Sequence, residues 1–106
     1  MQTGVVIFED NRQLRESIVN MITFSKDMLV LGNFSEVGNV EERVKALQPD
    51  VILMDIDMPG KSGIDLCQEV KESYPSVFVI GLSTFNQQSF IQKMMDNGAS
   101  GYVLKN

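Results

Sequence analysis

Four short apolar runs in this chain each lead into polar side chains that could act together in chemistry. The runs, with the polar residues that follow them, are Gly4–Phe8 with Glu9 and Asp10, Val51–Met54 with Asp55, Val77–Ile80 with Ser83 three residues on, and Tyr102–Leu104 with Lys105. Carboxylates held close together repel one another, and either a raised pKa or a bound cation relieves that repulsion. The first chemistry to consider is therefore cation binding by clustered acids.

The ligand types narrow the choice of cation. Carboxylate oxygens suit a hard divalent ion, so Mg²⁺ or Mn²⁺ is expected. The chain has no histidine, and its one cysteine, Cys67, lies far from the acidic run ends, which argues against a zinc or copper site. Ser83 and Lys105 would add a hydroxyl donor and an ammonium, and a dianionic phosphoryl group needs that mixture of partners.

The apolar runs are expected to be parallel strands. Val51–Met54 has no polar alternation, which is typical of a strand buried on both faces of a parallel sheet, with Asp55 at its carboxyl end. In open α/β sheets ligands bind at that edge. If the first and third strands are neighbours, Glu9, Asp10 and Asp55 converge there.

Helical patterns separate the runs. Residues 11–25 carry Leu14, Ile18 and Met21 or Ile22 on one face after an N-cap at Asp10 or Asn11. Further helical stripes follow Gly38, Gly63 and Asn86, and Met28–Phe34 is expected to be an edge strand because Gly32 interrupts it. Five strands alternating with four helices predict a doubly wound, flavodoxin-like α/β fold with strand order 2-1-3-4-5.

Length and charge limit the class of protein. The 106 residues predict a single domain over 1–106, and its net charge of −5 argues against direct nucleic-acid binding or attachment to a membrane surface. The chain has no secretion signal and no apolar stretch of spanning length, so a cytoplasmic location is expected.

A helix should follow the last strand to cover one face of the sheet, and the sequence ends without one. The domain is therefore expected to be incomplete at its C-terminus. Each large apolar side chain that stays exposed for lack of this helix lowers the free energy of unfolding by about 1.5 to 3 kcal/mol. We expect marginal stability or self-association through that face.

These residues resemble a known family, the receiver domains of two-component response regulators. The motif Asp55-x-x-Met58-Pro59-Gly60-x-x-Gly63 occurs together with Glu9, Asp10, Ser83, Tyr102 and Lys105, in order along the chain. The resemblance covers essentially all 106 residues. Lys105 followed by Asn106 is similar to the subfamily with a helix-turn-helix output domain.

The resemblance implies a role for each of these residues. Asp55 would accept a phosphoryl group from a histidine kinase or phosphotransfer protein, and the domain would catalyse its own phosphorylation and dephosphorylation without being a conventional enzyme. Glu9, Asp10, Asp55 and the backbone carbonyl of Asp57 would hold Mg²⁺. Lys105 would contact the phosphoryl group, and Ser83 and Tyr102 would switch the surface seen by an output domain. A homodimer is allowed.

Two other functions share this region. Asp55-x-Asp57 also matches the nucleophile and acid of haloacid-dehalogenase-like phosphatases, although those expect Thr or Val in place of Pro59. A receiver-like module that binds partners without phosphorylation is the third alternative. An EF-hand loop starting at Asp55 is excluded, because Leu66 stands where a bidentate Glu is required.

Overall fold

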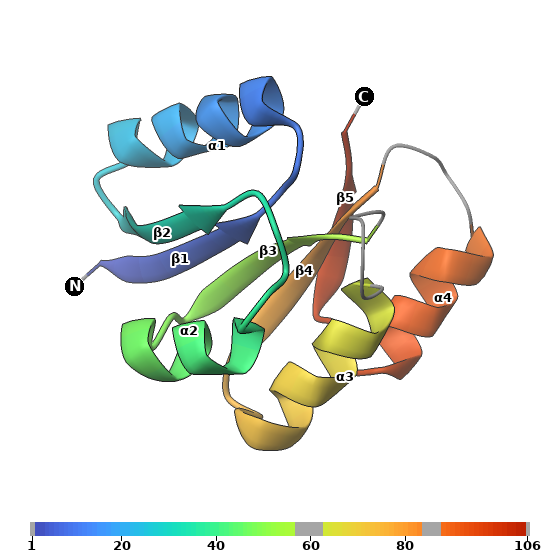
Figure 1. Cartoon of the computed structure of the whole chain (residues 1–106). Coiled ribbons are helices and arrows are strands. Elements are labelled where there is room, and N and C mark those ends of the chain that lie inside the picture. Colours follow the sequence, from blue (N-terminus) through green and yellow to red (C-terminus); the bar gives the residue numbers. More distant parts are fainter. Residues whose placement is uncertain (1, 57–62, 84–87, 106) are drawn as a thin grey trace.

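The computed structural model of the chain describes residues 2–56, 63–83 and 88–105. Five parallel strands form one sheet in the order β2-β1-β3-β4-β5, as the sequence predicted. In chain order the elements are β1 (Thr3–Phe8), α1 (Arg12–Phe24), β2 (Met28–Phe34), α2 (Val40–Leu47), β3 (Val51–Asp55), α3 (Gly63–Ser73), β4 (Phe78–Ser83), α4 (Gln88–Asp96) and β5 (Gly101–Leu104). Figure 1 shows the helices on both sides of this sheet.

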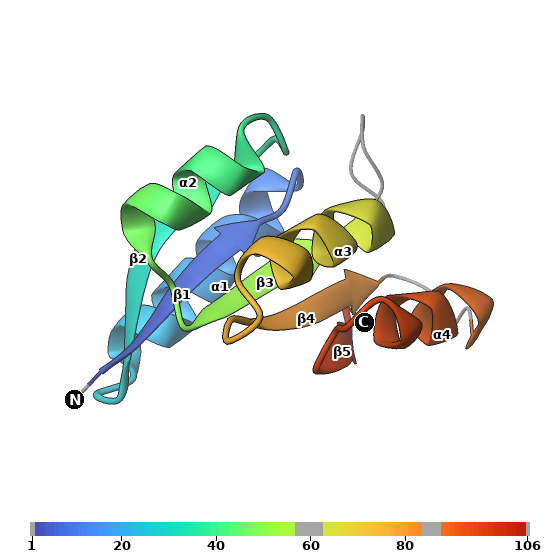
Figure 2. The same cartoon turned by 90° about the horizontal axis from the view of Figure 1, so that it is seen from below.

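The larger core lies between the sheet and the layer of α2, α3 and α4, which Figure 2 shows along one face. Alternate strand residues such as Val6, Ile52 and Val79 point into it and are fully buried. Val44 of α2 and Cys67 of α3 meet them, so Cys67 acts as a small buried apolar residue, as expected. This layer fixes the strands whose carboxyl ends carry the acidic residues.

The opposite face of the sheet carries a smaller core built on α1. Val5, Ile7 and Ile22 are buried there, while Val51 and Leu53 are only partly buried. The expectation that β3 is buried on both faces is therefore wrong for this side. Among the described helices only α1 packs on this face. The part of the face that α1 leaves uncovered forms an apolar groove of about 550 Å³, lined by residues such as Leu53, Ile80 and Val103.

Several local predictions are confirmed and refined. Asn11, not Asp10, caps α1: its side chain accepts a hydrogen bond from the Leu14 N–H at 3.0 Å. Gly98 has φ +99°, the left-handed conformation expected after α4. The proposed N-cap Asn86 lies outside the described residues. No helix in the described part of the chain is long and apolar enough to cross a membrane.

Candidate functional site

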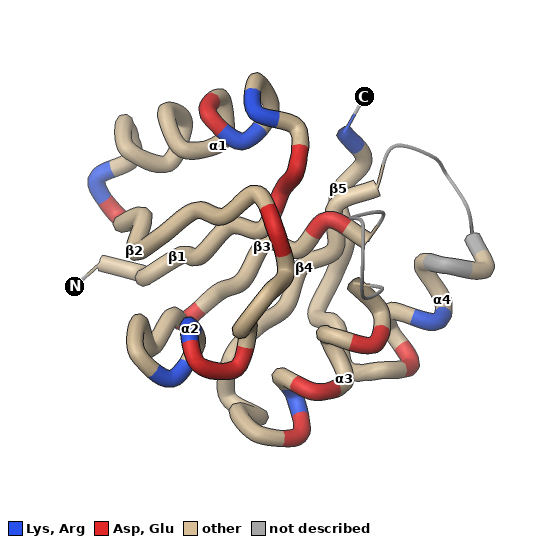
Figure 3. The backbone as a smooth tube through the Cα atoms, in the orientation of Figure 1, with Lys and Arg blue, Asp and Glu red and all other residues tan. Residues whose placement is uncertain are grey.

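The carboxyl ends of β1 and β3 bring three acidic residues together. Phe8 and Met54 are paired in the β1–β3 register, so the residues that follow them lie side by side. Carboxylate oxygens of Glu9, Asp10 and Asp55 all lie within 4.8 Å of one another. Figure 3 shows acidic segments at these strand ends and a basic segment beyond β5 at the same edge of the sheet. The predicted convergence is confirmed.

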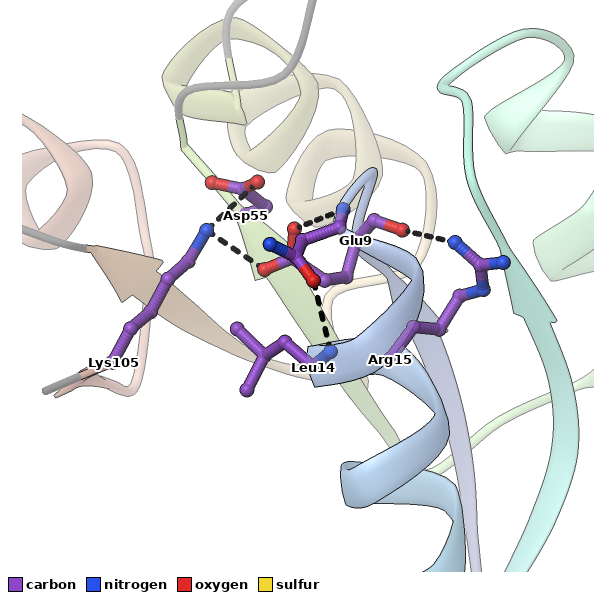
Figure 4. Close-up of polar contacts among 6 residues, drawn as sticks. Glu9, Leu14, Arg15, Asp55 and Lys105 are labelled. Carbon is purple, nitrogen blue, oxygen red and sulfur yellow. Dashed lines mark hydrogen bonds and ion pairs between the residues drawn. The ribbon is translucent and has the colours of Figure 1, made fainter.

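Lys105 bridges two of these acids. Its Nζ lies 2.7 Å from Glu9 Oε1 and 2.9 Å from Asp55 Oδ2 (Figure 4). Glu9 and Asp55 are almost completely buried, and the Lys105 side chain is only 12% exposed. The Lys105 N–H donates a 2.8 Å hydrogen bond to Ser83 O, which continues the β4–β5 ladder. This bond fixes the backbone position from which the Lys105 side chain extends. The ammonium thus offsets carboxylate charge inside the protein.

Burial and pairing shift the ionisation of these groups in different directions. Burial raises the pKa of Glu9 to about 7, against the opposing effects of Lys105 and the Asn11 N–H. The pKa of Asp10 falls below its ordinary value because the Glu9 side chain hydrogen-bonds to it. Burial alone would lower the pKa of Lys105, but its pairs with Glu9 and Asp55 outweigh burial and raise that pKa. Without a metal, the site therefore tends to keep a proton on Glu9.

The donor set fits a hard divalent cation. Glu9, Asp10 and Asp55 offer only oxygen ligands, and Asp10 is exposed, which leaves the cluster open to solvent on one side. An open depression of about 640 Å³ borders Asp10 and Asp55 and extends over Leu14 of α1. The fourth predicted ligand, the Asp57 carbonyl, lies outside the described residues. The three described carboxylates match the oxygen ligands that Mg²⁺ prefers in proteins.

The two predicted switch residues lie on neighbouring strands. Ser83 ends β4 and is 2% exposed, at the same sheet edge as Asp55. Tyr102 on β5 pairs with Gly81 of β4 and is 45% exposed. Both are therefore placed near the end of the sheet that carries the acids, Ser83 inside and Tyr102 toward the surface.

Sequence reasoning missed Arg15. This residue of α1 lies one turn beyond the N-cap, and its Nη1 donates a 2.9 Å hydrogen bond to the backbone oxygen of Glu9. Its only sequence signal was its place in the first turn after the acidic pair. That position gives no hint that the side chain reaches back to a backbone oxygen.

Gly63 allows α3 to start directly against the strand that carries Asp55. A methyl group there would lie 2.8 Å from Asp55 O and 2.8 Å from Ile56 Cα, both backbone atoms. We expect Gly63→Ala to lower the free energy of unfolding by about 1 to 3 kcal/mol, the usual cost of overpacking. Urea denaturation would measure this. Gly101→Ala is the control, because its methyl would meet nothing within 4 Å, and equal losses in both variants would contradict the explanation.

Comparison with known proteins adds an independent finding. The sequence profile of the family described as "Response regulator receiver domain" matches residues 5–106. The transcriptional regulatory protein DegU of Brevibacillus brevis is 34% identical over 95% of this chain and 43% of its own length. The oxygen regulatory protein NreC of Staphylococcus haemolyticus is 31% identical over 96% of this chain and 48% of its own length. The chain thus spans about half the length of these curated relatives.

Solved structures agree with the sequence match. A DNA-binding response regulator of the LuxR family from Staphylococcus aureus superimposes with a TM-score of 0.89 at 28% identity. The match covers 97% of this chain and 86% of that one. The strand order and the helix placement are therefore those of this group of proteins.

Proposed function

The chain belongs to the response regulator receiver domain family, and from that premise we propose that Asp55 accepts a phosphoryl group from a phosphohistidine donor. The observation that carries the proposal is the cluster itself: Glu9, Asp10 and Asp55 within 4.8 Å, with the Lys105 ammonium between Glu9 and Asp55. A buried carboxylate beside a fixed ammonium is suited to an anionic phosphoryl group.

In the proposed reaction a carboxylate oxygen of Asp55 attacks phosphorus. The new bond to oxygen forms as the bond from phosphorus to the donor's imidazole nitrogen breaks, and the imidazole leaves with that electron pair. The product is an acyl phosphate on Asp55. Lys105, 2.9 Å from Asp55 Oδ2, would pair with a phosphoryl oxygen. Attack by a carboxylate oxygen transfers no proton, so the step requires no general base.

Glu9, Asp10 and Asp55, with the Asp57 carbonyl, are the proposed Mg²⁺ ligands. When bound, the ion would offset the charge of the phosphoryl oxygens during transfer. Glu9 must give up its proton to act as a ligand, since its pKa of about 7 keeps it partly protonated near neutral pH. Asp10, with its lowered pKa, is already ionised.

The added charge on Asp55 is proposed to be sensed by Ser83 and Tyr102. Ser83, buried at the end of β4, would move toward the phosphoryl group and hydrogen-bond one of its oxygens. Tyr102 would then turn inward into the space that this movement leaves. The result would be a shift between two states, which changes the surface of α4 and β5. An output domain that binds DNA would respond to this change, since one relative is called a transcriptional regulatory protein and another a DNA-binding response regulator. The domain would act in the cytoplasm.

The deciding experiment is intact mass spectrometry after incubation with acetyl phosphate. We expect a gain of one phosphoryl mass with Mg²⁺ and none with a chelator, and hydroxylamine should remove the group because it cleaves acyl phosphates. A folded protein that gains no mass would refute the proposal in favour of an interaction module without phosphorylation. Repeated turnover of a phosphate monoester, with release of inorganic phosphate, would instead favour a phosphatase acting through Asp55 and Asp57.

A further inference from the structure

The backbone of Glu9 is held from two directions by elements that flank the site. Its N–H donates to Phe34 O at the end of β2, at 3.0 Å. Its carbonyl oxygen accepts from Arg15 Nη1 of α1, at 2.9 Å. Figure 4 shows Arg15 and Lys105 on opposite sides of Glu9. Lys105 engages the carboxylate of Glu9, whereas Arg15 engages only its backbone.

The carbonyl that Arg15 holds belongs to the peptide group joining Glu9 to Asp10. That group is a rigid plane, so the direction of the Glu9 carbonyl also sets the direction of the Asp10 N–H. β1 ends at Phe8 and α1 begins at Arg12, so this peptide lies between the two elements. Asp10 is exposed, and burial therefore does little to hold its side chain in place.

We propose that Arg15 is a positioning residue, which fixes the Glu9–Asp10 peptide plane and so preorganises these two carboxylates for a divalent cation. This inference rests on the proposed function, because it requires that the acids bind Mg²⁺. Arg15 would not touch the cation. It would act through the backbone, as residues outside the ligand shell do when they orient ligands.

Electrostatics makes the opposite prediction, which gives the test a decisive sign. A guanidinium near an acidic cluster repels a cation, so loss of its charge alone should strengthen Mg²⁺ binding. Loss of the positioning contact should weaken binding instead. The direction of the affinity change therefore separates a positioning role from a simple charge effect.

Arg12 provides a matched control on the same helix. Its side chain is 82% exposed and pairs with Glu16 of the same helix at 3.0 Å. Arg12→Gln and Arg15→Gln remove the same charge from the first turn of α1. Arg15→Lys keeps the charge and an ammonium that can donate a hydrogen bond, so it should recover part of any loss.

The experiment is a titration of each metal-free variant with MgCl₂ at fixed ionic strength, followed by backbone amide NMR. We expect Arg15→Gln to weaken Mg²⁺ binding about tenfold. This is the lower end of the usual loss of metal affinity when a residue that orients a metal ligand is replaced. Arg15→Lys should lie between it and the wild type, and Arg12→Gln should match the wild type or bind more tightly. Before Mg²⁺ is added, Arg15→Gln should already shift the amide signals of Asp10 and Asn11.

The outcomes are distinguishable. Wild type that binds Mg²⁺, together with an Arg15→Gln variant that binds as tightly or more tightly, overturns the inference and leaves the proposed function intact. Wild type that binds no Mg²⁺ overturns both. If Arg15→Gln does not fold, Arg15→Lys decides the matter: affinity and Asp10 amide signals identical to the wild type would overturn the role assigned to the guanidinium.

Discussion

An Asp55→Asn variant is expected to take up no phosphoryl group under conditions that label the wild type completely. The carboxamide is nearly the same shape as the carboxylate but is a poor nucleophile, so it cannot form the acyl phosphate. Asp55 closes β3 and is 1% exposed, so a substitution that preserves its shape should leave the fold in place. Intact mass after incubation with acetyl phosphate and Mg²⁺ measures the result.

Asp65→Asn is the matched control for this loss. Asp65 is an exposed carboxylate in the first turn of α3, so its replacement makes the same chemical change outside the cluster. It should be labelled as fully as the wild type. A hydroxylamine-sensitive phosphoryl group that persists in Asp55→Asn would assign the acceptor role to another carboxylate and would refute the mechanism proposed above.

Lys105→Met is expected to produce the largest loss of stability among single substitutions at the site. It removes the ammonium that lies between Glu9 and Asp55, two carboxylates that are 0% and 1% exposed. Breaking a buried ion pair by removing the cation typically costs about 3 to 5 kcal/mol, because buried carboxylate charge is no longer offset by a positive charge. Urea denaturation of the metal-free protein at about pH 8 would measure the change in the free energy of unfolding.

The loss should depend on pH in a defined direction. The pKa of Glu9 is raised in the folded protein from 4.5 to about 7, so the folded state holds a proton that the unfolded state has released in that window. Below about pH 7 Glu9 is mostly neutral and needs its cation partner less. Lys105→Met should therefore cost less at pH 5 than at pH 8.

Mg²⁺ and a surface lysine provide two further checks on this prediction. Added Mg²⁺ should recover part of the stability of Lys105→Met, since a bound cation supplies the missing positive charge. Lys45→Met removes the same charge from an exposed position on α2 and should change stability little. Equal losses in the two variants at all pH values would show that Lys105 is not a partner of buried carboxylates.

The convergence of the acids could be predicted from the sequence for a simple reason. Parallel strands that alternate with helices bring their carboxyl ends to one edge, so Glu9, Asp55 and Lys105 had to lie near each other once the strand order was inferred. The order itself was taken from the doubly wound fold class, and only the edge position of β2 followed from a local pattern, the interruption at Gly32. Pattern and topology were sufficient at this level.

Details of the contacts could not be predicted because they depend on side-chain rotamers and on depth within the protein. Glu9 and Asp10 are adjacent acids in the sequence, yet one is fully buried and paired with Lys105 while the other is exposed. Arg15 could as easily have pointed to solvent, as Arg12 does. The partial exposure of Val51 and Leu53 depends on how much of a sheet face one helix can cover.

The position of β5 gives the ion pair of Lys105 a further consequence. β5 has four residues, pairs with β4 at one edge of the described sheet, and three of its residues are exposed. Short edge strands of this kind open locally at a lower free energy than the whole domain, and amide hydrogen exchange detects such openings. Lys105, directly after β5, reaches past β4 to Asp55 on β3 and to Glu9 after β1. Detachment of this strand would withdraw the Lys105 ammonium from both carboxylates. The exchange rate of the β5 amides is therefore expected to report how firmly Glu9 and Asp55 hold the Lys105 side chain.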